Sequence, residues 1–142
     1  MPAVSVSIFR KRTKAQKQVV LNAVRNAVLT AFEMENKGYS IRLQQYEPCD
    51  FLLPPGKDRD FILVELSIFC GRTDSRKRAL YRLISEYLEG AGENGKHVTV
   101  ILHEPHMENW GIAGGYMAAD YFNSSSNNLD NGSNNRDGGE GK

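Results

Sequence analysis

The second residue of the chain, Pro2, is the first whose type and position could do chemistry. We expect Met1 to be removed, as is usual before a small residue, which would leave Pro2 with a free secondary amine. An α-amino group has a reference pKa of roughly 7.7–8.0, close to neutral pH. Burial and nearby guanidinium charges would lower the pKa of this amine further, as a general base requires. The other interpretation is a strand-edge proline that avoids an unpaired N–H.

Basic residues gather in two stretches, although the net charge is only +1. The two stretches contain Arg10, Lys11, Arg12, Lys14 and Lys17, and Arg72, Arg76, Lys77, Arg78 and Arg82. Two clusters of this kind could bind nucleic acid. Solvated surface charge is the alternative. The near-neutral total and the absence of interleaved aromatic residues argue against nucleic acid as a partner.

Other chemistry-bearing residues give weaker patterns. The tetrapeptide 103–106, His-Glu-Pro-His, follows a predicted strand and is split by a proline, so it lacks the helical geometry of a zinc motif. Cys49 and Cys70 stand at unrelated spacing, as expected for reduced thiols. We therefore expect no metal, no cofactor and a cytoplasmic location. No apolar run approaches the roughly 18 residues of a membrane span, so we expect no membrane partner.

The elements that must position these residues are encoded twice. Residues 4–17 and 64–77 share seven identities in fourteen aligned positions. Each copy begins with a β-prone stretch, passes an Arg-Thr pair, and continues into a helix with one apolar face. Thr13 and Thr73 suit the N-cap position of these helices. A second strand follows in each copy, which predicts two βαβ repeats at residues 2–48 and 62–105.

Two βαβ units predict an α/β fold with a four-stranded mixed sheet and two helices on one face. The other face also needs cover, which oligomerisation or the segments 49–61 and 107–122 could supply. After residue 122 the sequence consists mainly of Asn, Ser, Gly and Asp, with little to bury. We therefore expect one domain at residues 1–122 and a disordered tail at 123–142.

The combination resembles the tautomerase superfamily, which includes 4-oxalocrotonate tautomerase, macrophage migration inhibitory factor and malonate semialdehyde decarboxylase. The resemblance covers most of residues 2–122. It rests on Pro2 after Met1, the doubled Arg-Thr corner, Ser-Ile-Arg-Leu at 40–43, Asn-Trp-Gly-Ile-Ala-Gly-Gly at 109–115, and the repeat itself. It implies a doubled tautomerase-like fold, a C-terminal hairpin at 107–122, and assembly as a homotrimer.

The resemblance also implies roles for particular residues. Pro2 corresponds to the family's catalytic base, and arginines at the corners or on the second strand correspond to its carboxylate-binding groups. Arg72 is our first choice, because the site beside the N-terminal proline in doubled members tends to use the second corner. Arg42 follows, and then Arg12. Trp110 matches an aromatic residue that walls the pocket, and it could equally anchor a subunit interface.

These assignments predict a cofactor-independent tautomerase that catalyses keto–enol proton transfer on a small 2-oxo or enol carboxylic acid. A decarboxylase or hydratase of a small 3-oxo or unsaturated acid is one alternative, and a non-catalytic interaction protein is another. The decarboxylase pattern is incomplete: Cys70 stands where that family has a second arginine, and no carboxylate matches its acid. Glu47 and Glu65 are available, but no motif assigns them a role.

Overall fold

The computed structural model describes residues 2–35 and 39–130. The chain divides into two compact units, Met1–Glu104 and Pro105–Lys142. The predicted hairpin therefore belongs to a second unit and not to the unit of the two repeats. No helix in the described ranges is long and apolar enough to cross a membrane.

The first unit is built on one four-stranded sheet in the order β2-β1-β3-β4. Strand β1 (Ala3–Ile8) pairs in parallel with β2 (Ser40–Gln45), and β3 (Ile62–Ser67) pairs in parallel with β4 (Val98–His103). The two repeats join through antiparallel pairing of β1 with β3. This topology confirms the predicted mixed sheet of two βαβ units.

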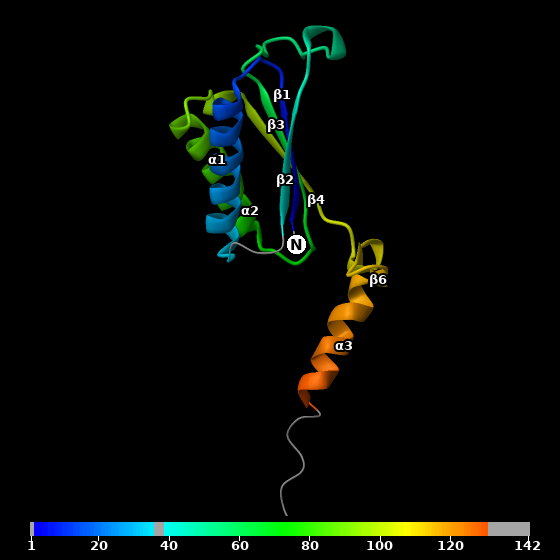
Figure 1. The fold of residues 1–142 in the computed structure, drawn as a ribbon. Coiled ribbons are helices and arrows are strands. Elements are labelled where there is room, and N and C mark those ends of the chain that lie inside the picture. The colour runs from blue at the N-terminus through cyan, green and yellow to red at the C-terminus, as the bar shows by residue number, and fades with distance from the viewer. Residues whose placement is uncertain (1, 36–38, 131–142) are drawn as a thin grey trace, which may run out of the picture. The chain divides into compact units, whose positions relative to one another are not determined.

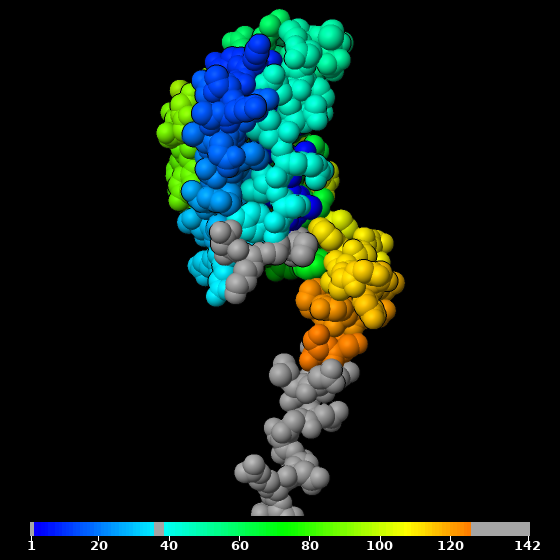
Figure 2. Space-filling model, in the orientation of Figure 1, coloured from blue at the N-terminus to red at the C-terminus, as the bar shows by residue number. Residues whose placement is uncertain are grey.

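Both long helices, α1 (Lys14–Phe32) and α2 (Asp74–Gly90), cover the same face of the sheet (Figure 1). They lie side by side, as Figure 2 shows from the outside. Each begins at a threonine whose hydroxyl accepts a backbone N–H, Thr13 from Gln16 and Thr73 from Arg76. The Arg-Thr pairs therefore mark the corners where strand turns into helix.

The hydrophobic core fills the space between the sheet and these helices. Alternate residues of the central strands point into it, and one stripe of each helix faces them. Its fully buried members include Val4, Val6, Ile8, Val20, Val24, Val28, Ile62, Val64, Leu66, Leu80, Ile84 and Leu88. Because each such side chain contributes about 1.5–3 kcal/mol on burial, this layer holds the corners in place.

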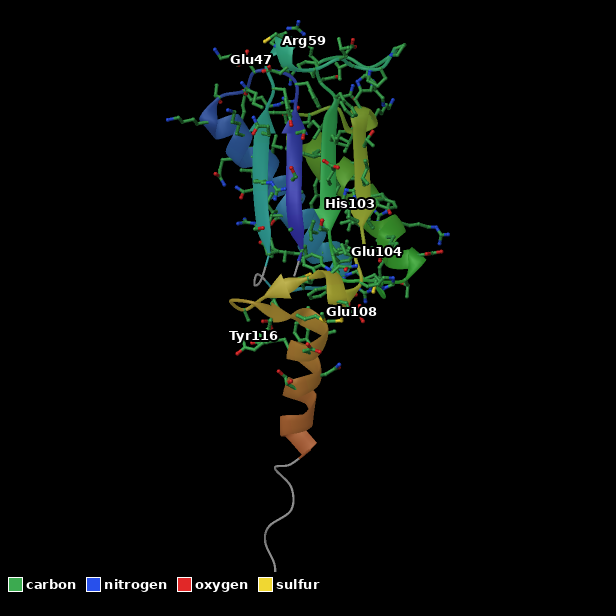
Figure 3. The ribbon with its side chains drawn as sticks, turned by 90° about the vertical axis from the view of Figure 1, so that its right-hand side faces the viewer. Glu47, Arg59, His103, Glu104, Glu108 and Tyr116 are labelled. Carbon is green, nitrogen blue, oxygen red and sulfur yellow. The ribbon has the colours of Figure 1, made fainter. Side chains whose placement is uncertain are left out.

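The opposite face of the sheet carries mostly polar side chains, and Figure 3 looks onto it. Ser5 on β1 is level with Arg42 on β2 and with Glu65 on β3. No helix of the described first unit covers this face (Figure 1). Residues 49–61 do not cover it either, because they gather at the end of the sheet where Glu47 lies (Figure 3). Of the two kinds of cover considered, the alternative in which residues 49–61 fold back over the open face is therefore not what the structure has.

Aromatic packing explains why residues 49–61 stay at that end. Phe9 follows β1, and its ring stacks on Tyr46 and Phe61 with centroids 5.4 Å apart in each pair. Phe51 meets the same ring edge-on at 4.7 Å. These contacts hold the segment against the end of β1.

The second unit contains a short hairpin of β5 (Gly111–Ile112) and β6 (Tyr116–Met117). The turn between them places Ala113, Gly114 and Gly115 at positive φ, which explains its two glycines. A short 3-10 helix at Met107–Asn109 precedes these strands, so of the hairpin predicted at 107–122 the structure has only residues 111–117.

From there the chain is helical, as α3 (Ala118–Asp130). The expectation of disorder was wrong for residues 123–130, and residues 131–142 lie outside the described residues. The hydroxyls of Ser124 and Ser125 donate to the carbonyls of Asp120 and Tyr121, so these polar residues satisfy themselves within the helix. Ring contacts around Tyr121 add packing that composition alone does not reveal.

Candidate active site

Pro2 lies at the start of the central strand β1 and is buried. Its carbonyl accepts the N–H of Ser40 at 3.1 Å, at the beginning of β2. Its neighbour Ala3 is level with Ser67, the last residue of β3. Pro2 is thus held where β2 begins and β3 ends, at the end of the sheet marked N in Figure 1.

Arg72 stands at the same end of the sheet. Because β1 and β3 are antiparallel, the corner that follows β3 lies beside the start of β1. Arg72 Nη1 donates to the carbonyl of Phe69 at 3.0 Å. The guanidinium carbon lies 4.3 Å above the centre of the Phe32 ring, a cation–π contact with the last residue of α1. The hydrogen bond to Phe69 and the contact with the Phe32 ring therefore hold the Arg72 guanidinium in place.

Burial and neighbouring charges act on the half-buried Arg72. Burial lowers the pKa of Arg72, the charge of Glu104 opposes that shift, and Arg76 adds to it. A partly desolvated guanidinium attracts a carboxylate more strongly than one in bulk water. Nearby acids are bound to other cations: Glu33 pairs with Arg76 at 3.0 Å, and Glu104 pairs with Lys77.

Arg12 lies at the opposite end of the sheet, after β1. It is only 5% exposed. Its Nε and Nη2 donate to the two carboxylate oxygens of Glu93 at 2.8 and 2.5 Å, and Nη1 donates to the carbonyl of Arg10. The structure therefore does not bring Arg12 to Pro2. The two guanidinium nitrogens of Arg12 that could hold a substrate carboxylate already bind the carboxylate of Glu93.

The other two predicted site residues lie on different surfaces. Arg42 is exposed, and its register with Ser5 places it on the open face of the sheet. Trp110 belongs to the second unit, where its Nε1 donates to the carbonyl of Pro105 at 3.2 Å. Of the three predicted arginines, Arg72 is the one that shares an end of the sheet with Pro2.

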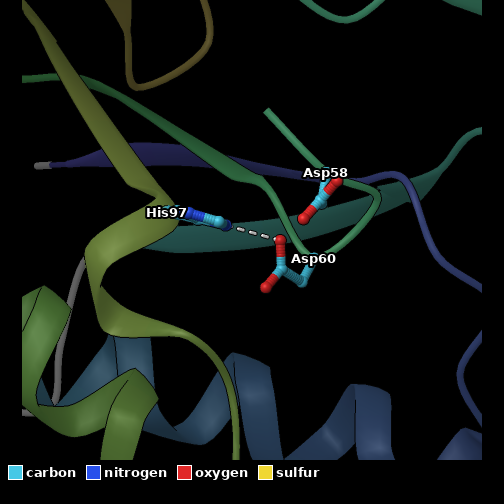
Figure 4. A group of neighbouring side chains, drawn as sticks. All are labelled: Asp58, Asp60 and His97. Carbon is cyan, nitrogen blue, oxygen red and sulfur yellow. Dashed lines mark hydrogen bonds and ion pairs between the residues drawn. The ribbon is translucent and has the colours of Figure 1, made fainter. Parts of the chain in front are cut away.

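One group of possible metal ligands escaped the sequence reasoning: Asp58, Asp60 and His97 (Figure 4). Their ligand atoms lie within 4.8 Å of one another. Parallel pairing of β3 with β4 brings them together from distant parts of the chain, so no local motif signals them.

Protein partners already satisfy the central carboxylate of this group. Asp60 meets His97 Nδ1 at 2.7 Å and accepts from Asn94 at 2.9 Å. The hydrogen bond with His97 lowers the pKa of Asp60. These contacts tie the loop before β3 to the start of β4, which is a structural role.

Comparison with known proteins agrees with this architecture. A family model described as tautomerase enzyme matches residues 38–113, more than half of the chain. The chain therefore belongs to this tautomerase family, as the motifs predicted. A search of the curated proteins found no match.

Solved structures of related enzymes share the fold. A wild-type fused 4-OT, described as a symmetric trimer, is 27% identical with a TM-score of 0.73, and the match covers 82% of this chain and 96% of that one. A malonate semialdehyde decarboxylase, described with decarboxylase and hydratase activities, is 25% identical with a TM-score of 0.72 and coverages of 87% and 98%. The fold prediction is confirmed, and tautomerase-superfamily enzymes are the structural relatives.

Proposed function

We propose that the protein is a cofactor-independent tautomerase acting on a small 2-oxo or enol carboxylic acid. Neutral Pro2 removes a proton from the carbon acid and returns it at a neighbouring position. Arg72 binds the substrate carboxylate and stabilises the negative charge of the enolate. The observation that carries this proposal is the shared position of Pro2 and Arg72 at one end of the sheet.

The surroundings of Pro2 suit a neutral amine. The residue is buried, and the guanidinium groups of Arg72 and Arg76 belong to the corner at the same end. Burial and positive charge would both disfavour a protonated amine at this position. The related malonate semialdehyde decarboxylase was solved together with a variant carrying alanine in place of its first-residue proline. That precedent makes the same replacement informative for this chain.

Assembly as a homotrimer would complete the site. The open sheet face has no cover within the described first unit, and the fused 4-OT relative is described as a trimer. In a trimer, Arg42 on that face and Trp110 could contribute to a pocket at a subunit boundary. Sedimentation equilibrium gives the mass of the assembly directly, and a monomer at micromolar concentration would contradict this part of the proposal.

The decisive experiment concerns the chain terminus and the base. Mass spectrometry of the purified protein should show that Met1 is absent, because a proline amide nitrogen cannot act as a base. Phenylpyruvate ketonisation is then assayed for wild type and Pro2→Ala. Alanine is also small, so Met1 is still removed, but a flexible primary amine replaces the rigid secondary one. We expect kcat to fall about 100-fold or more with an unchanged melting temperature. Retained Met1 or equal rates would overturn the proposal.

A decarboxylase or hydratase is the second candidate. Glu65 and His103 favour it, because their side chains meet at 3.3 Å on the open face and such a pair can activate water. Incubation with malonate semialdehyde separates the two functions. Carbon dioxide release that depends on Glu65 would support the second candidate over simple tautomerisation.

A further inference from the structure

A carboxylate of the protein itself, that of Glu104, lies near Arg72, the proposed substrate clamp. Glu104 directly follows β4, and the bond from Ile68 N–H to the His103 carbonyl continues the ladder to that point. Figure 3 shows His103 and Glu104 at the end of β4, away from Glu47 at the other end of the sheet. The end of β4 is also the end of the sheet where Pro2 lies.

Glu104 is close enough to influence Arg72 electrostatically. Its negative charge raises the pKa of Arg72 against the lowering effect of burial. The Glu104 carboxylate could therefore compete with a substrate carboxylate for the partly desolvated guanidinium of Arg72. Its hydrogen bond, however, goes elsewhere. Lys77 Nζ donates to Glu104 Oε1 at 2.5 Å, and each side chain is only about a quarter exposed.

At the other corner, a carboxylate of the protein does bind the arginine. At Arg12, the acid Glu93 accepts hydrogen bonds from both Nε and Nη2 of the guanidinium. The repeat supplies counterparts of the restraining pair, Lys17 and Glu47, but the described contacts do not join these two residues. Of these two equivalent lysine–glutamate pairs, the described contacts thus include only the one at the Pro2 end of the sheet. That is the end where Arg72 must remain available to the substrate carboxylate.

We infer that Lys77 is a positioning residue that holds Glu104 away from Arg72 and so keeps the guanidinium available for the substrate carboxylate. This inference rests on the proposed function of Arg72. Without Lys77, the free carboxylate of Glu104 turns to Arg72 and competes with substrate. Competition of this kind raises KM and leaves kcat nearly unchanged, because saturating substrate displaces the internal acid.

Four variants test the inference in phenylpyruvate ketonisation: Lys77→Met, Lys77→Arg, Glu104→Gln, and the double variant K77M/E104Q. We expect Lys77→Met to raise KM about tenfold with little change in kcat, since a charge-assisted hydrogen bond must be displaced. Lys77→Arg and Glu104→Gln should stay near wild type. The double variant should recover the wild-type KM, which a merely structural lysine would not allow. Lys17→Met is the matched control from the first repeat and should leave KM unchanged.

A binding measurement separates this inference from the proposed function. Calorimetric titration with benzoate, which cannot tautomerise, is carried out in the Pro2→Ala background. Lys77→Met should weaken benzoate binding about tenfold, and adding Glu104→Gln should restore it. This pattern would uphold the inference even if Pro2 proved irrelevant to turnover. A double variant that binds benzoate as weakly as Lys77→Met, or a Lys77→Met variant that binds it as well as the Pro2→Ala parent, would overturn the inference.

Discussion

Arg12 and Arg72 occupy equivalent corners of the two repeats but lie at opposite ends of the sheet. Arg12 is buried and donates from two nitrogens to Glu93. Arg72 is half-buried and rests on the Phe32 ring and the carbonyl of Phe69. A guanidinium whose fork is filled by an internal acid ties segments of the fold together. The Arg72 guanidinium is held by one hydrogen bond and by the Phe32 ring, so its other N–H groups can bind a ligand.

The proposed catalytic base gives a reason for the two corners to differ. Pro2 begins one central strand with a nitrogen that processing can free, whereas its repeat counterpart Ile62 has an ordinary peptide nitrogen that is no base. In the proposed mechanism, amine chemistry is therefore confined to one end of the sheet. The other end is available for packing, and Phe9 with its aromatic neighbours has closed it. The proposed function thus assigns a site to the Arg72 corner and leaves the Arg12 corner with a structural role.

The largest expected effect is on the Arg12 corner. Glu93→Ala should lower the free energy of unfolding by about 3–5 kcal/mol, because it leaves the Arg12 charge buried without its partner. Urea denaturation at fixed chain concentration measures this. Replacing both residues by apolar ones, as R12M/E93L, should recover most of the loss. A Glu93→Ala variant as stable as wild type would remove the structural role of this corner.

The Arg72 corner should respond in kinetics instead. Arg72→Ala should lower kcat/KM for phenylpyruvate about 100-fold, because a bidentate charge-assisted contact to the substrate is lost. Arg12→Ala is the matched control. This variant should be less stable, but the molecules that are folded should have the wild-type KM. Steady-state kinetics at a temperature where both variants are folded separates the two corners. Equal kinetic losses in both would end the distinction between them.

Local patterns in the sequence were enough to predict the strands, helices and corners. The spacing of apolar residues and the Arg-Thr pairs carried that information, so the βαβ repeats emerged with nearly correct bounds. The same local identity could not distinguish the corners. Glu93 is 81 residues from Arg12 in sequence, and Glu104 is 27 residues from Lys77. Such partners become neighbours only when the sheet assembles.

The C-terminal helix α3 is an element that the sequence did not lead us to expect. Residues 123–130 have a polar composition with low helix propensity, which favoured disorder. In the structure, ring contacts of Tyr121 with Tyr116 and Phe122 pack the first turn of this helix, and the Ser124 and Ser125 hydroxyls find acceptors on the carbonyls of Asp120 and Tyr121. The amino-acid composition of residues 123–130 therefore did not reveal the helix, because composition does not show which side chains contact one another.

A smaller effect should come from the ring beneath the clamp. Phe32→Leu keeps an apolar side chain at the end of α1 but removes the cation–π contact with Arg72. A looser guanidinium binds the substrate carboxylate less well, so KM should rise about threefold with kcat nearly unchanged. The melting temperature of the variant checks that the core is intact. An unchanged KM would mean that the hydrogen bond to Phe69 alone orients Arg72.

The smallest expected effect belongs to the structural end and depends on pH. His97 lowers the folded-state pKa of Asp60 below its unfolded value. The stability from this carboxylate is therefore fully present above its unfolded pKa of about 3.9, and is lost as pH falls through the folded pKa. Urea denaturation between pH 2.5 and 6 should show a shallower acid loss for Asp60→Asn than for wild type. Kinetics at neutral pH should stay unchanged in this variant, because Asp60 lies at the end of the sheet away from Pro2. Parallel acid curves for the two proteins would show that the Asp60–His97 contact adds no pH-dependent stability.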